Sequence, residues 1–66
     1  MEIFRKEMKL LGYSITSLGK EMGKGASNIH GWINGDFVPN AESIKKLKQI
    51  GFSDTAVLNP SKEVEV

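Results

Sequence analysis

Apolar residues recur along the chain at helical spacing, and glycines or prolines separate the segments that they mark. Positions three and four residues apart lie on one face of a helix. The pattern predicts helices over residues 2–10, 15–22, 26–34, 41–50 and, more briefly, 54–58. Ser14, Asn40 and Ser53 precede three of them as N-caps, because their side-chain oxygens accept bonds from free first-turn N–H groups. We therefore expect an all-α domain, a compact bundle of four to five helices.

The inward-facing positions of these helices form the expected core. They are Ile3, Phe4, Met8, Leu11, Leu18, Met22, Ile29, Trp32, Ile33, Ile44, Leu47, Ile50 and Leu58. A chain of 66 residues has room for one domain and buries about 60% of its unfolded surface. With no cysteine and a single histidine, neither a disulfide nor a conventional zinc site is available to reinforce it. Apolar packing alone must hold the fold.

Residues 1–59 are expected to form the domain, and residues 60–66 follow it as a tail. The terminal position and the charge of the tail favour a flexible segment. Alternation of Val64 and Val66 with Glu63 and Glu65 is also compatible with an edge strand.

The stretch 14–39 carries the functional information: a helix of about eight residues, a glycine-bearing turn and a second helix of similar length. Two helices that cross steeply need a small residue where they touch, which Gly19 supplies, while Gly23 permits positive φ in the turn. Ile29 holds the second helix on the first, and Trp32 closes the underside of the core. The predicted core of the motif is Leu18, Gly19, Gly23, Ile29 and Trp32.

The segments 13–24 and 29–35, followed by 38–40, resemble the two halves of the helix-turn-helix in the phage repressor and Cro family. The resemblance covers residues 3–58. It implies a lambda-repressor-like bundle whose third helix enters the major groove of double-stranded DNA. Three positions depart from the family pattern. Gly19 stands where alanine is usual, at a cost of about 1 kcal/mol in helix propensity, Lys24 where an apolar residue is usual, and Ile15 where a glutamine often touches phosphate.

The outward side of the third helix would face the bases. By position, the candidates for base contact are Gly25, Ala26, Ser27, His30 and Gly31. Because these residues are so small, we expect close backbone approach, with part of the specificity coming from DNA shape. Ala26 suits a thymine methyl group, and contact by His30 would strengthen on protonation. Alternatively, Gly25 is only a flexible turn residue and N-cap, Ser27 a solvated first-turn serine and His30 an ordinary exposed histidine.

Phosphate contacts are expected around this helix, from Thr16, Lys20, Lys24, Asn28 and Asn34, together with Lys45 or Lys46. The alternative for each is an ordinary surface role, and for Asn34 a helix C-terminal cap. Phe37, in the loop after the helix predicted over residues 26–34, either packs on that helix or serves a dimer contact. The net charge of +1 supports nucleic-acid binding only weakly, although basic residues concentrate in the first fifty positions.

The leading hypothesis is a sequence-specific transcriptional regulator, a repressor of phage or mobile-element type. A homodimer on DNA is compatible with it, through Phe52, Thr55, Val57 and Leu58 or through pairing of residues 63–66. The alternative is a protein-interaction module in which the same bundle has lost DNA recognition. We expect no enzyme, cofactor or small-molecule substrate, because no nucleophile–base pair, metal-ligand cluster or phosphate loop is visible. Without an apolar run or a signal peptide, a soluble, cytoplasmic protein is expected.

Overall fold

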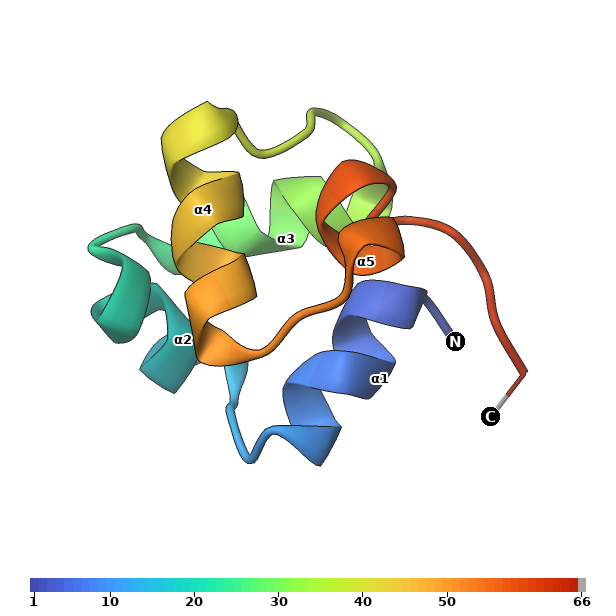
Figure 1. Cartoon of the computed structure of the whole chain (residues 1–66). Coiled ribbons are helices and arrows are strands. Elements are labelled where there is room, and N and C mark those ends of the chain that lie inside the picture. Colours follow the sequence, from blue (N-terminus) through green and yellow to red (C-terminus); the bar gives the residue numbers. More distant parts are fainter. Residues whose placement is uncertain (66) are drawn as a thin grey trace.

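The computed structural model describes residues 1–65. This part of the chain contains five helices and no strand (Figure 1). They are α1 (Ile3–Leu10), α2 (Ile15–Met22), α3 (Ala26–Asn34), α4 (Ala41–Ile50) and α5 (Asp54–Leu58). The domain is therefore all-α, as predicted. The first helix begins one residue later than expected, because Glu2 has extended backbone and pairs with Glu63 in an antiparallel bridge.

The three predicted N-caps are confirmed by hydrogen bonds. Ser14 Oγ accepts from the backbone N–H of Ser17 at 3.1 Å, and the Ser17 hydroxyl accepts from the Ser14 N–H at 2.9 Å. Asn40 Oδ1 accepts from the Ser43 N–H at 2.9 Å. At the fifth helix, Ser53 Oγ accepts from Ala56 at 3.2 Å. Local side-chain chemistry thus fixes where α2, α4 and α5 begin.

Three aromatic rings from distant parts of the chain meet at the centre of the core. Phe4 of α1 is fully buried, stacks on Phe52 with ring centroids 4.6 Å apart and meets Trp32 of α3 edge-on at 5.9 Å. Such aromatic pairs contribute about 0.5–1.5 kcal/mol beyond the area that they bury. The buried apolar side chains are Phe4, Met8, Leu18, Met22, Ile29, Trp32, Ile33, Leu47, Phe52, Ala56 and Val57.

The core differs from the sequence prediction around α5 and at the end of α1. Phe52 and Val57, predicted on a dimer surface, are buried, whereas Leu58, predicted in the core, is 65% exposed. Because α5 turns Ala56 and Val57 inward, the next side chain points away from the bundle. Leu11, also predicted in the core, follows the last turn of α1 and is 37% exposed.

Residues 60–65 lie on the domain, although the sequence favoured a flexible tail. Pro60 is buried, the Ile3 N–H donates to the Lys62 carbonyl at 2.7 Å, and the Val64 N–H donates to the Met1 carbonyl at 2.9 Å. The edge-strand alternative is reduced to one bridge within the chain, and Val66 lies outside the described residues. Residues 1–3 therefore pair with one edge of this segment, which was one of the two surfaces suggested for a dimer.

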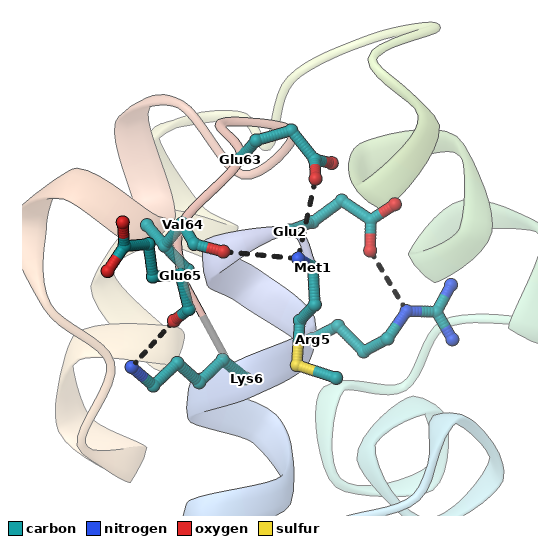
Figure 2. Close-up of polar contacts among 7 residues, drawn as sticks. All are labelled: Met1, Glu2, Arg5, Lys6, Glu63, Val64 and Glu65. Atoms are coloured by element: carbon teal, nitrogen blue, oxygen red, sulfur yellow. Dashed lines mark hydrogen bonds and ion pairs between the residues drawn. The ribbon is translucent and has the colours of Figure 1, made fainter.

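Polar contacts hold the N-terminal residues against residues 63–65, and Figure 2 shows this clasp between the two segments. The amino group of Met1 donates to the Val64 carbonyl at 3.1 Å and lies 3.4 Å from a carboxylate oxygen of Glu63. Beside it, Arg5 Nε donates to Glu2 Oε1 at 3.0 Å. The N-terminus and the described part of the tail lie on the side of the molecule away from α2 (Figure 1). The clasp leaves the α2–α3 turn uncovered.

Candidate nucleic-acid interface

The turn between α2 and α3 is closed by a pair of main-chain hydrogen bonds. Gly23 has left-handed backbone, with φ of 68°. The Lys24 N–H donates to the Gly19 carbonyl at 2.8 Å, and the Gly23 N–H donates to the Lys20 carbonyl at 3.3 Å. This is the Schellman pattern, in which glycine supplies the left-handed residue. The prediction that Gly23 makes the turn is confirmed.

Gly19 is required by a close approach of the turn to α2. A Cβ atom at this buried position would lie only 2.7 Å from the carbonyl oxygen of Lys24. The sequence suggested that glycine substitutes here for alanine at a cost in helix propensity. The structure adds the reason for it, since an alanine methyl group would overlap a backbone oxygen.

The inner side of α3 anchors it to the bundle through Ile29, Trp32 and Ile33, all buried. Its N-cap is Gly25, and no side chain caps the helix. The first-turn N–H groups at this end, which carry the positive end of the helix dipole, are thus left without a side-chain acceptor. Such an end is suited to an anionic ligand.

The candidate base-contact residues do not all lie open on the outer side of α3. Gly25, Ala26, Ser27 and His30 are exposed, as predicted. Gly31 is buried, and a Cβ atom placed on it would overlap the ring of Phe37. The expectation that Gly31 presents its backbone to a base is therefore corrected, because the loop after α3 folds back over it.

Phe37 is the residue whose role the sequence left open. Its ring packs on α3, as one of the two interpretations proposed, and remains 46% exposed. In the sequence, the signal of this contact is a glycine and an aromatic residue six positions apart, with the end of α3 between them. Only the loop conformation brings the two together.

The candidate phosphate contacts surround this face. Thr16 and Lys20 are exposed and, four residues apart, share one side of α2. Asn34 is exposed at the end of α3, whereas Asn28 is half-buried. Lys24 is exposed in the turn, and Lys45 and Lys46 are exposed on α4, so Asn28 alone among these candidates is partly buried.

A polar hollow lies between the turn and the start of α4. It has a volume of about 290 Å³ and is lined by Met22, Gly23, Lys24, Asn40, Glu42, Ser43 and Lys46. Within residues 1–65, Lys24 and Lys46 enter no ion pair, whereas Lys48 pairs with Asp54 at 2.7 Å. Two unpaired ammonium groups beside the turn would suit a phosphate, although Glu42 reduces the positive charge.

The outer side of α3 itself is nearly uncharged. The helix carries no acidic residue and no lysine or arginine. The outer side of α3 offers a ligand hydrogen bonds from Ser27 and His30, apolar contact and close approach to the backbone. Among residues 1–65 no group of acidic, histidine or cysteine side chains is arranged to hold a metal ion. No helix of that stretch is long and apolar enough to cross a membrane.

Comparisons with protein-family models, with curated proteins and with solved structures found no match to this chain.

Proposed function

We propose that this chain is a sequence-specific transcriptional regulator of the phage repressor and Cro type, in which α2 and α3 form a helix-turn-helix. In this proposal α3 enters the major groove of double-stranded DNA, and Ala26, Ser27 and His30 approach base edges. Thr16, Lys20 and Lys24 contact phosphates, which position the helix without reading sequence.

One observation carries the proposal: the tight turn that joins two short helices, of which the second exposes its outer side. The Schellman bonds at Gly23 and the close approach at Gly19 fix the conformation of the turn that joins α2 to α3. Packing of Ile29 and Trp32 then holds α3 with Ser27 and His30 outward. A helix held in this way matches what major-groove reading requires.

The unpaired lysines support the same proposal. Lys20 on α2, Lys24 in the turn and Lys46 on α4 are exposed and enter no ion pair within residues 1–65. Phosphate neutralisation by lysine releases counterions, so binding weakens as salt rises. A homodimer on DNA remains part of the proposal, through Thr55 and Leu58, the exposed part of the predicted dimer surface.

The test is binding to a fluorescein-labelled duplex of mixed sequence, followed by anisotropy at several salt concentrations. We expect a dissociation constant of about 10⁻⁴ to 10⁻⁶ M near physiological salt. Lys24→Ala and Lys46→Ala should each weaken binding and lower the slope of log affinity against log salt by about 0.9. Lys9→Ala, an exposed lysine in the last turn of α1, is the matched control and should leave the slope unchanged.

A folded wild-type chain that shows no salt-dependent binding would overturn the proposal. Equal slopes for Lys24→Ala, Lys46→Ala and Lys9→Ala would contradict the assignment of the two lysines to phosphates. The control is informative because all three substitutions remove the same charge from an exposed side chain.

A protein-interaction module is the second candidate, and one observation favours it. Phe37 and Val38 leave apolar surface exposed beside an α3 face that carries no lysine or arginine. Exposed apolar patches of this kind occur in protein-binding sites. A folded chain that ignores DNA but loses a protein partner on substitution of Phe37 would support this candidate.

A further inference from the structure

The ring of Phe37 lies on the side of α3 that faces away from the core. Gly31 is four residues after Ser27, so the two share one face of the helix. That face is opposite Ile29, which is fully buried. Since a Cβ atom on Gly31 would overlap the Phe37 ring, the ring occupies the space one turn beyond Ser27 on the outer side.

The ring is held there without being part of the core. It is 46% exposed, and the next residue, Val38, is 66% exposed. Glycine at position 31 is the condition for this arrangement, because any side chain would displace the ring. The loop thereby adds an aromatic surface to a helix face whose own exposed members, Ser27 and His30, are small or polar.

We propose that Phe37 is a specificity-determining residue that contacts the methyl group of a thymine. This inference rests on the proposed function, since it assumes that the outer side of α3 lies in the major groove. The C5-methyl of thymine is the one apolar group on the major-groove edges of the four bases. An exposed ring fits that group, whereas a phosphate oxygen or an amino group placed against the ring would lose hydrogen bonds to water without replacing them.

The position of the ring also assigns the order of contacts along α3. Ala26 and Ser27 stand in the first turn, and Phe37 covers Gly31 in the second half of the helix. The thymine read by Phe37 therefore lies beyond the base pair that faces Ser27, on the side toward the C-terminal end of the helix.

The experiment begins with selection of the preferred sites from a library of randomised duplexes by the full-length chain. Each thymine of the selected duplex is then replaced singly by deoxyuridine, which removes only the methyl group. At one position we expect wild-type affinity to fall about fourfold, the ratio that corresponds to burial of one methyl group. Phe37→Ala should bind the thymine and deoxyuridine forms of that duplex equally well.

Two further variants separate the ring from general effects. Gly31→Ala keeps Phe37 but displaces its ring, so it should also lose the discrimination. Leu10→Ala removes another exposed apolar side chain, 76% exposed on α1, and should retain the fourfold ratio. Circular dichroism checks that each variant is folded.

If, at every thymine of the selected duplex, the ratio of thymine to deoxyuridine affinity is the same for wild type and Phe37→Ala, the inference is overturned. The proposed function would stand. Failure to select or bind any duplex, with the chain folded, would overturn both. If Phe37→Ala loses the discrimination between thymine and deoxyuridine but Gly31→Ala retains it, the placement of the ring over Gly31 is not the basis of that discrimination.

Discussion

Replacement of Gly19 by alanine tests the account of the α2–α3 turn. In an ordinary helix interior this change is favourable, because alanine has a higher helix propensity than glycine by about 1 kcal/mol. Here the new methyl group would lie 2.7 Å from the carbonyl oxygen of Lys24. That oxygen belongs to the backbone, so the turn itself has to move.

The expected loss of stability follows from the contacts that this movement of the turn disturbs. The methyl group would be roughly 0.7 Å inside ordinary van der Waals contact. Overpacking of this kind costs about 1–3 kcal/mol. A shift of the turn also weakens the 2.8 Å bond from the Lys24 N–H to the Gly19 carbonyl, worth about 0.5–1.5 kcal/mol. After the gain in propensity of about 1 kcal/mol, we expect Gly19→Ala to lower the free energy of unfolding by about 0.5–3.5 kcal/mol.

Urea and thermal unfolding, followed by circular dichroism and by fluorescence of the buried Trp32, measure this change. In a domain of this size each kcal/mol lowers Tm by about 4–8 °C. Gly31→Ala is the matched control, because the same substitution in α3 overlaps the end of a half-exposed side chain, the ring of Phe37, rather than a backbone oxygen. It should be neutral or stabilising by up to about 1 kcal/mol. If Gly19→Ala is as stable as Gly31→Ala, the argument from the Lys24 carbonyl is wrong.

Two other predictions concern the α5 cap, Ser53, and the carboxylate of Glu2. Ser53→Ala should lower the free energy of unfolding by about 1–2 kcal/mol in thermal melts, because Ser53 caps α5 and its hydroxyl donates to Glu7 Oε2 at 2.6 Å; an unchanged Tm would contradict this. The pKa of Glu2 is held below its ordinary value of 4.5, first by its backbone hydrogen bond and then by Arg5. Its carboxylate therefore stabilises the fold above that value, and the contribution is lost as the pH falls through the lower folded-state pKa. Wild type should thus lose more stability than Glu2→Gln when Tm is measured from about pH 6 down to pH 3, and parallel curves would refute this.

The helices were predictable because their signals are local. Apolar spacing of three and four residues, a capping side chain and a following glycine all act within one or two turns. Ser14, Asn40 and Ser53 each cap the helix that they precede in the sequence. No distant contact was needed to locate these ends.

The core at α5 was not predictable in the same way. A helix of five residues is too short for periodicity to define its inner face, so the inward turn of Val57 and the exposure of Leu58 depend on the rest of the bundle. Phe52 is likewise buried by stacking on Phe4, 48 positions earlier. The bridge between Glu2 and Glu63 also depends on a long-range contact.

The candidate interface was predicted in part. The spacing of the motif placed Ala26, Ser27 and His30 on the outer side, where the structure exposes them. It did not place Phe37 over Gly31, because a loop conformation follows from no helical period. The glycine that the sequence assigned to close backbone approach instead accommodates a side chain of the same chain.

The central claim is that the outer side of α3 binds duplex DNA, and backbone amide shifts test it most directly. Isotope-labelled protein would be titrated with a mixed-sequence duplex at low salt and again at several-fold higher salt. We predict shifts concentrated between Lys24 and Asn34 and at Phe37, fading as salt rises. Unchanged amides in that stretch, in a protein that remains folded, would contradict the claim.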